Sequence, residues 1–167
     1  MKHLYLVRHA KSSWGDPSQP DFERPLNERG KRDAPVMAHR LKKRIPTPDL
    51  FLSSPAKRAK KTCKIFCEEF HASEKDIQYA DKLYLASVQT FYDIISSVDK
   101  DVKHLVVFSH NPGITDFANS LCEGVAIANM PTCSIFAVKL KISDWKEIAI
   151  AEKEFEFFDY PKLEESL

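Results

Sequence analysis

The feature that most constrains the fold is a short apolar run near the N-terminus that ends abruptly in two polar residues. Residues 4–7 read Leu-Tyr-Leu-Val, and Arg8 and His9 follow them directly. An uninterrupted apolar run of this length predicts a strand that is buried on both faces, as in a parallel sheet covered by helices. Ligands of such sheets bind beyond the strand ends, so we expect Arg8 and His9 to line a site.

Apolar runs typical of strands recur along the chain, at residues 50–52, within 77–85, and at 104–108, 133–140 and 146–158. Amphipathic helical patterns separate the earlier runs, whereas the last two follow each other directly and are predicted to pair as antiparallel strands. This order predicts an α/β domain over residues 1–160, a three-layer α/β/α sandwich around one sheet. Residues 161–167 are predicted to form an acidic, frayed C-terminal tail.

Cap-forming residues and prolines indicate where the helices begin. Asn27 is predicted to cap the first helix, and Pro35 lies inside the apolar pattern of that helix. We therefore expect a kink at Pro35 or a helix that becomes regular only after it. Ser54 and Asn111 are each followed by proline and are predicted to cap the second and the last helix.

Four side chains are predicted to meet at one edge of this sheet. Arg8 and His9 end the first strand, His110 follows the strand at 104–108, and Arg58 lies near the start of the helix after residues 50–52. Singly, His110 reads as a cap and Arg58 as part of a solvated basic face, but their convergence favours a site. Arginine binds phosphate in a fork, neutral histidine can attack phosphorus, and two helix N-termini favour an anion there.

Motifs extending over residues 4–115 carry a family resemblance. They are Leu-Val-Arg-His-Ala at residues 6–10, Arg-Pro-Leu at 24–26, Ser-Pro-Ala-Lys-Arg-Ala-Lys-Lys-Thr at 54–62 and Ser-His-Asn-Pro-Gly at 109–113. In this order they resemble branch 1 of the histidine phosphatase superfamily. Because alanine follows the first histidine, the chain is most similar to the SixA-type phosphohistidine phosphatases. The resemblance implies a phosphoglycerate-mutase-like fold, with a six-stranded mixed sheet in which one strand is antiparallel.

The chemistry and the resemblance give the same roles to the four residues. His9 is the predicted nucleophile, which becomes phosphorylated, and its other ring nitrogen should donate to a backbone carbonyl. Arg8 and Arg58 are predicted to clamp the phosphate oxygens, and His110 to donate to one of them. No metal or other cofactor is predicted, because no carboxylate cluster suited to a metal is evident.

Further residues are weaker candidates for the same site. Arg24 is predicted to be a third arginine that binds the substrate from the loop after the first strand. Asp21 and Asn111 are also predicted to contact the substrate, and Asp21 is the nearest spare carboxyl that could act as a general acid. Thr132 and Ser134 lie near the predicted edge and could line the pocket.

The sequence departs from the mutase-type relatives at two places. Gly15 stands where those relatives carry a phosphate-binding asparagine, and residues 83–87 lack the glutamate that acts as their general acid. An imidazole leaving group has a conjugate acid with a pKa of about 6.5 and needs less help than an alkoxide. The predicted substrate is therefore phosphohistidine on a partner protein, such as a phosphorelay or phosphotransferase carrier. The alternatives are a small-molecule phosphomonoesterase or mutase, and a phosphate- or phosphoprotein-binding module without turnover.

Composition bears on location and partners. The net charge is +1 and no apolar run is long enough to span a bilayer, so neither nucleic acid nor membrane is a predicted partner. The four cysteines form no zinc pattern, which favours free thiols in a cytoplasmic protein. We expect a monomer. The basic run over residues 57–64 is predicted to be a solvated helix face or, alternatively, a docking surface for an acidic phosphoprotein.

Overall fold

The computed structural model describes residues 1–163. Most of the predicted acidic tail, residues 164–167, lies outside the described residues. At the start of that tail the chain is still attached to the domain, because Arg40 Nη2 donates to the backbone oxygen of Pro161 at 3.3 Å.

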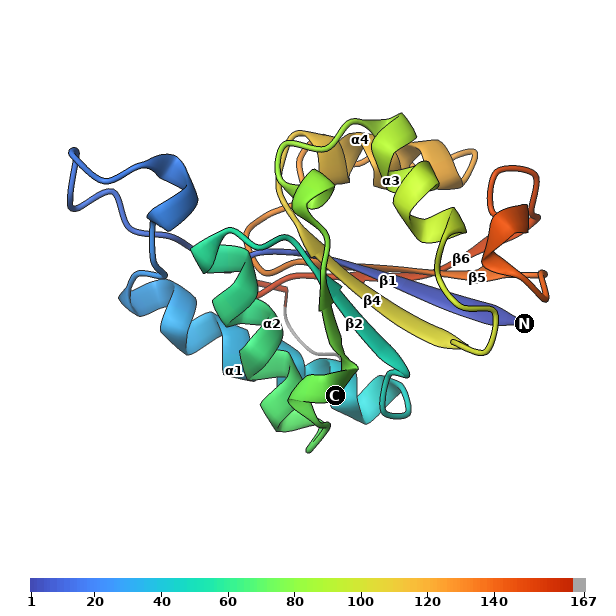
Figure 1. The fold of residues 1–167 in the computed structure, drawn as a ribbon, viewed down its shortest axis with the longest axis horizontal. Helices are drawn as coiled ribbons and strands as arrows, with labels where there is room; N and C mark the ends of the chain where they lie inside the picture. The colour runs from blue at the N-terminus through green and yellow to red at the C-terminus, as the bar shows by residue number, and fades with distance from the viewer. Residues whose placement is uncertain (164–167) are drawn as a thin grey trace.

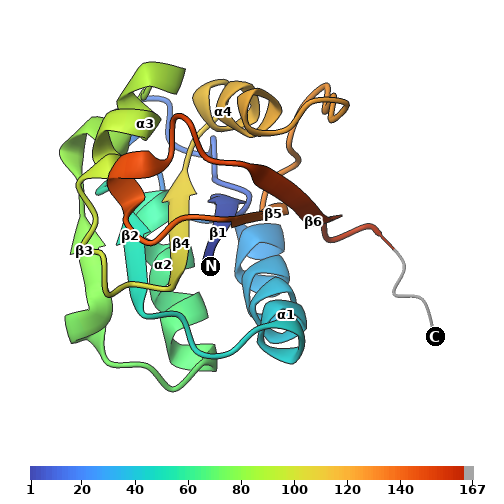
Figure 2. The same ribbon diagram turned by 90° about the vertical axis from the view of Figure 1, so that its right-hand side faces the viewer.

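A six-stranded sheet forms the centre of the domain, in the order β3-β2-β4-β1-β5-β6 (Figure 2). Its strands are β1 (Lys2–Arg8), β2 (Leu50–Ser53), β3 (Ile77–Tyr79), β4 (His104–Ser109), β5 (Ile135–Leu140) and β6 (Lys153–Asp159). β5 is antiparallel to both of its neighbours, while β1 to β4 pair in parallel. The predicted mixed sheet with one antiparallel strand is confirmed.

Two helices cover each face of the sheet, which gives the predicted three layers (Figure 1). The helices are α1 (Glu28–Arg44), α2 (Lys57–Glu69), α3 (Val88–Ser96) and α4 (Gly113–Leu121). Alternate residues of β1 enter different cores: Leu4 and Leu6 pack in the cluster under α3 and α4, while Tyr5 and Val7 pack in the cluster under α1 and α2. Both faces of β1 are thus buried against apolar side chains, which explains why its sequence is an uninterrupted apolar run.

Both predicted proline-linked caps are wrong. α2 begins at Lys57 after Ala56, and α4 begins at Gly113 after Pro112, so each helix starts later than Ser54 or Asn111 would place it. The cap at Asn27 is confirmed, because its side chain accepts from the backbone of Gly30.

Two other predicted boundaries are also corrected. α1 is already helical seven residues before Pro35, so the expectation of a helix that becomes regular only after the proline is wrong. The strand predicted over residues 146–158 begins only at Lys153, because a 3₁₀ turn over Trp145–Glu147 occupies the start of that segment. Asp144 and Glu147 close that turn with a capping box, a local polar pattern that competes with strand formation.

The loop between β1 and α1 projects beyond the sheet (Figure 1) and is fastened at its base. Ser13 donates its backbone N–H to the oxygen of Pro25, and Asn27 donates to the oxygen of Lys11. Gly30 lies directly against this base, since an added Cβ would stand 2.1 Å from the Lys11 oxygen. Only glycine allows α1 to approach the loop so closely.

Candidate active site

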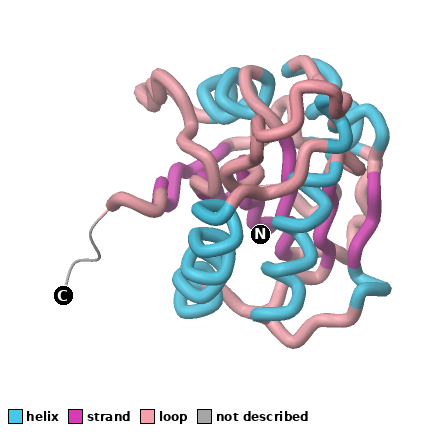
Figure 3. Tube along the Cα trace, turned by 90° about the vertical axis from the view of Figure 1, so that its left-hand side faces the viewer, coloured by secondary structure: helices cyan, strands magenta, loops and turns pink. Residues whose placement is uncertain are grey.

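The site lies at the carboxyl edge of the sheet, where the ends of β1 and β4 stand side by side. Arg8 of β1 is in register with Ser109 of β4, so His9 and His110 follow at adjacent positions, with ring centroids 5.1 Å apart. Figure 3 looks onto this side of the domain, where loops and helix ends gather. Parallel pairing of two apolar strands is therefore what brings the two histidines together.

A pocket of about 400 Å³ holds all seven predicted site residues, namely Arg8, His9, Asp21, Arg24, Arg58, His110 and Asn111. Thr132 also lines it. Ser134 does not line the pocket and is fully buried, with a hydroxyl that lacks a partner within the described part of the chain. The predicted convergence of residues is thus observed, while the chemical role of each remains a prediction.

His9 is held in one neutral tautomer. Its Nδ1 lies 2.8 Å from the oxygen of Ala10, which can only accept, so Nδ1 carries the proton. Arg58 Nε donates to His9 Nε2 at 3.3 Å, which requires a lone pair on Nε2. Burial lowers the pKa of His9 well below its usual 6.5, and the charges of Arg58 and Arg8 act in the same direction. Nε2 therefore carries a lone pair, as an attacking nitrogen requires.

Three guanidinium groups, here called the arginine cage (Arg8, Arg24 and Arg58), line the same pocket. Arg8 donates from Nη1 to the oxygen of Met130 at 2.8 Å, but its buried Nε has no partner within the described residues. Arg24 stacks on the indole of Trp14, with its central carbon 3.5 Å from the ring centroid. The side chains of the cage are thus held in place by their neighbours, and Arg8 Nε remains as a donor that could bind an anion.

Asp21 joins two members of the cage. Its carboxylate accepts from Arg24 Nε and from Arg58 Nη2, each at 3.0 Å, and Tyr84 donates its hydroxyl to the same group at 2.5 Å. Burial raises the pKa of Asp21, but the hydrogen bonds from Tyr84 and the arginines outweigh it and lower the pKa to about 2. The group is therefore ionised at neutral pH and, in this state, has no proton to donate as a general acid.

His110 faces the pocket with one nitrogen occupied and the other free. Its Nε2 lies 2.7 Å from the hydroxyl of Ser54, and its buried Nδ1 has no partner among residues 1–163. Burial, reinforced by the charge of Arg58, lowers the pKa of His110 to about 3, so the ring is neutral in this state. Ser54, predicted to cap a helix, instead orients this histidine.

Asn111 lines the pocket but its amide is occupied elsewhere. Its side chain donates to Asn129 Oδ1 at 2.6 Å and to the oxygen of Met130 at 3.1 Å, and it accepts from Thr115 at 2.5 Å. These bonds fasten the segment that also holds Arg8 through the Met130 oxygen. The geometry thus gives Asn111 a supporting position at the rim of the pocket.

Sequence reasoning missed several residues of the site. Lys11, Ser12, Trp14 and Leu85 line the pocket, and Tyr84 donates its hydroxyl to the pocket residue Asp21. The proximity of Lys11 and Ser12 to His9 could have suggested them. Leu85 and Tyr84 lie in a segment that is distant in sequence from the loop of Trp14, so only the folded chain could bring them there.

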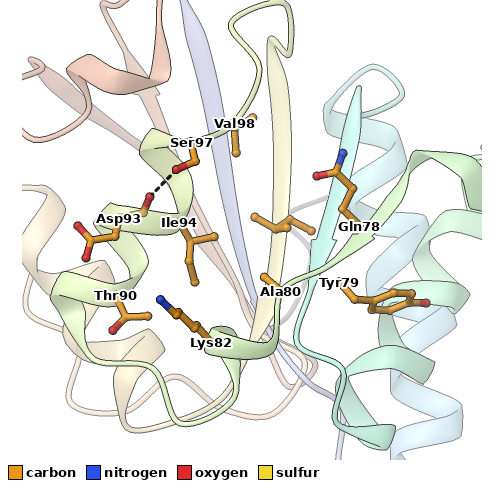
Figure 4. A pocket seen from close by; sticks show the side chains of 10 residues that line it. Gln78, Tyr79, Ala80, Lys82, Thr90, Asp93, Ile94, Ser97 and Val98 are labelled. Carbon is orange, nitrogen blue, oxygen red and sulfur yellow. Dashed lines mark hydrogen bonds between the residues drawn. The ribbon is translucent and has the colours of Figure 1, made fainter.

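A second hollow, of about 460 Å³, lies between β3 and α3 and carries none of the predicted site residues (Figure 4). Its side chains include both Lys82 and Asp93, so no single charge dominates it. Over residues 1–163, no group of three or more His, Cys, Asp or Glu side chains is placed to hold a metal ion. In the same part of the chain, no helix has the length and apolar character needed to cross a membrane.

Comparisons with known proteins point to one superfamily. The family model of the histidine phosphatase superfamily (branch 1) matches residues 4–84. A SixA protein from Agrobacterium tumefaciens is 27% identical, with a TM-score of 0.80 over 96% of this chain and 98% of that one. The protein histidine phosphatase SixA in complex with tungstate is 21% identical, with a TM-score of 0.80 over 95% and 97% of the two chains. An uncharacterised chloroplast protein of Arabidopsis thaliana is 29% identical over 87% of this chain and 70% of its own length.

A neutral histidine beside three guanidinium groups, at the carboxyl edge of the parallel strands, is chemically able to attack a phosphoryl group and to bind its oxygens. The family match over residues 4–84 and the likeness to the Agrobacterium SixA structure both agree with the SixA-type resemblance that the motifs predicted. Its fold matches SixA structures and also, with a TM-score of 0.64, a mycobacterial glucosyl-3-phosphoglycerate phosphatase. The family match and the likeness to the Agrobacterium SixA structure support phosphatase activity.

Proposed function

We propose that this protein removes the phosphoryl group from phosphohistidine on a partner protein, through a phosphohistidine formed on His9. The observation that carries the proposal is the state of His9, which is neutral and directs the lone pair of Nε2 into the arginine cage. A neutral imidazole is a nucleophile, and the surrounding guanidinium groups offer charge to the phosphoryl oxygens.

The proposed reaction has two displacements at phosphorus. In the first, His9 Nε2 forms a bond to phosphorus while the bond from phosphorus to the substrate nitrogen breaks, and the electron pair leaves with that nitrogen. Protonation of the distal nitrogen lets the substrate ring depart as neutral imidazole. In the second, a water oxygen forms the new bond to phosphorus and the bond to His9 breaks, with its electron pair returning to Nε2. Both protons of the water leave with the product as dihydrogen phosphate.

The remaining groups of the site stabilise charge in both displacements. Arg8 Nε and His110 Nδ1 are buried in the site without a partner in the described chain, so both are available to phosphoryl oxygens. If the Ser54 hydroxyl donates to His110 Nε2, the proton of the neutral ring resides on Nδ1, which then acts as a donor. Each such pre-oriented donor is typically worth about 10²–10³ in rate.

The preference for a P–N bond follows from the ionised state of Asp21. An alkoxide leaving group needs a positioned acid, whose help is typically worth about 10²–10⁴ in rate. The pKa of Asp21 is about 2, so this carboxylate supplies no proton at neutral pH. Phosphoramidates and activated aryl esters should therefore react well, and sugar or serine phosphates poorly.

Two features support a protein as the substrate. Two large apolar side chains at the pocket are exposed to solvent, Trp14 at 73% and Leu85 at 74%, and exposed apolar surface beside a site favours macromolecular contact. The solved relative in complex with tungstate is named a protein histidine phosphatase. All four cysteines are free, which supports the reducing cytoplasm, where a monomer would act in signal transduction.

Trapping of the intermediate tests the proposal. The enzyme is incubated with a labelled phosphoramidate, quenched in base and digested, and an acid-labile label is expected on His9. The His9→Ala variant should lose turnover while keeping the wild-type circular dichroism spectrum, and a chelator should leave the wild-type rate unchanged. Binding of phosphate without a covalent label, or full activity of His9→Ala, contradicts the proposal.

A further inference from the structure

A second cationic feature lies beside the active site, between the first turns of α1 and α2. It is a groove of about 420 Å³ with Pro25 and Leu26 at its apolar floor. Five lysines complete its lining and define what is here called the lysine groove: Lys31, Lys57, Lys60, Lys61 and Lys64. Four of these are exposed and Lys64 is half-buried.

Few acidic side chains neutralise this groove. Within residues 1–163, Lys31 is the only one of the five that has a carboxylate partner, Glu28, at 3.6 Å. Lys60 lies over the ring of Tyr79, with 5.2 Å from its nitrogen to the ring centroid. By contrast, the hollow between β3 and α3 places Lys82 among side chains that include Asp93 (Figure 4). The groove therefore presents a positive surface in which one of the five lysines is paired with a carboxylate.

The lysines of α2 are unfavourable for the helix that carries them. The N-terminal end of a helix is partially positive, and the first turn of α2 has no acidic residue. Lys57 and Lys61 stand at positions i and i+4, as do Lys60 and Lys64, so each pair repels across one turn. A bound anionic segment would relieve both effects, whereas water alone relieves them only in part.

The groove is continuous with the catalytic pocket along the chain. Lys57 directly precedes Arg58, and Pro25 directly follows Arg24, so one residue of each pair faces the groove and the other belongs to the arginine cage. A single peptide could therefore occupy both the groove and the pocket, with only a few residues between the two bound parts.

We propose that the lysine groove docks an acidic segment of the phosphorylated partner protein, with one apolar side chain of that segment on Pro25 and Leu26. This inference rests on the proposed function, since it assigns how the substrate of the same site is recognised. An apolar floor ringed by lysine stems suits a peptide that mixes carboxylates with an aliphatic residue. The groove lining contains no aromatic side chain on which a nucleotide base could stack.

Two synthetic peptides with a central phosphohistidine provide the test. One has Asp, Glu and Leu around the phosphohistidine, and the other has Ser, Gln and Leu. The wild type is compared with Lys61→Glu/Lys64→Glu and with the control Lys42→Glu/Lys146→Glu, which makes the same change in net charge at exposed sites outside the groove. The measured quantities are kcat/KM for both peptides and for p-nitrophenyl phosphate, and fluorescence anisotropy of the labelled, unphosphorylated acidic peptide.

The wild type is expected to prefer the acidic peptide by about tenfold at low salt and to lose this preference at high salt. The groove variant should lose the preference and the anisotropy signal, while the control variant keeps both and p-nitrophenyl phosphate is turned over equally by all three. Equal behaviour of the two variants overturns docking, as does tighter, groove-dependent binding of a labelled oligonucleotide. If neither phosphopeptide reacts while p-nitrophenyl phosphate does, the proposed function fails and anisotropy alone decides docking.

Discussion

The arginine cage and the lysine groove are two cationic regions that meet between Lys57 and Arg58, and they are built in opposite ways. The cage arginines are held by neighbours: Arg58 is buried and donates to both the backbone and the carboxylate of Asp21. The groove lysines are mostly exposed, and among the described residues only Lys31 has an acidic partner. Both regions carry positive charge, and α2 contributes Arg58 to the cage and four lysines to the groove.

This difference separates two uses of positive charge. A guanidinium fixed by hydrogen bonds offers donors at defined positions, which is what a transferring phosphoryl group requires. An ammonium on a flexible stem acts through its charge, attracts anions over a Debye length and tolerates many partners. The comparison therefore predicts that the cage depends on the shape of its side chains and the groove only on their charge.

The largest effect is expected from a change of shape in the cage. Arg58→Lys keeps the charge but removes the donors to His9 and Asp21, so kcat for an aryl phosphate should fall by about 10²–10³. The matched change in the groove, Lys61→Arg, should leave kcat/KM for the acidic phosphopeptide within about twofold. Steady-state kinetics of both variants provide the measurement. Comparable losses in the two variants would show that shape matters equally in both regions.

A smaller effect is expected when the support of the cage is weakened. Asp21→Asn removes the charge that fixes Arg24 and Arg58, and displaced catalytic groups typically lose about 10- to 100-fold. Since Asp21 is ionised, the loss in kcat/KM should be the same for phosphohistidine peptide, p-nitrophenyl phosphate and 3-phosphoglycerate. Tyr84→Phe, which removes one hydrogen bond to the same carboxylate, is the milder control. A loss confined to 3-phosphoglycerate would instead mark Asp21 as the general acid.

Acid should act on the cage through its buried histidines. His110 has a pKa of about 3, and the pKa of His9 lies well below 6.5, so below about pH 6.5 the unfolded chain binds more protons than the folded one. Stability is therefore lost as the pH falls, by up to about 1.4 kcal/mol per pH unit for each histidine. Urea unfolding between about pH 7 and pH 4.5 measures this loss.

Replacing His110 by glutamine should reduce the loss of stability in acid, because the substituted side chain does not titrate. His71→Asn is the control, since His71 is exposed and its φ of 55° suits asparagine. An unchanged pH dependence in His110→Gln would rule out this histidine as a cause. In the wild type, kcat should remain high below the usual pKa of histidine for as long as the protein stays folded, because His9 stays neutral there.

The smallest effect concerns the stability of α2. Lys61→Glu/Lys64→Glu replaces repulsion from Lys57 and Lys60 by attraction, against one new repulsion between position 64 and Glu68, so it should raise the free energy of unfolding by up to about 0.5 kcal/mol. The variant designed to abolish docking is thus expected to be the more stable protein. Urea midpoints at low and high salt provide the measurement. A decrease in the free energy of unfolding would mean that Lys61 and Lys64 stabilise the folded protein.

The main elements and most of the site followed from the sequence because each rests on a local pattern. The apolar runs of β1 and β4 identify strands buried on both faces, and the polar residues that follow them identify the edge with the site. The register of Arg8 against Ser109 then brings two histidines together that are about a hundred residues apart. No tertiary contact was needed to predict this convergence.

Where prediction failed, tertiary contacts override a local preference. Ser54 has the sequence of a helix cap, yet its hydroxyl is used to orient His110. Asn111 has the same signature, yet its amide is bonded to Asn129 and Met130. Tyr84 and Leu85 reach the site only because the folded chain brings the segment after β3 against the pocket and His110, for which no short motif exists.

The stacking of Arg24 on Trp14 has a consequence for how ligands can be observed. The chain contains two tryptophans, and the second, Trp145, is fully buried and donates to the backbone oxygen of Val102. Trp14 is exposed and touches a member of the cage, so an oxyanion that draws Arg24 toward phosphorus changes the surroundings of one indole and leaves the other as a constant background. The protein thus carries its own optical reporter of site occupancy, which requires neither turnover nor an attached dye.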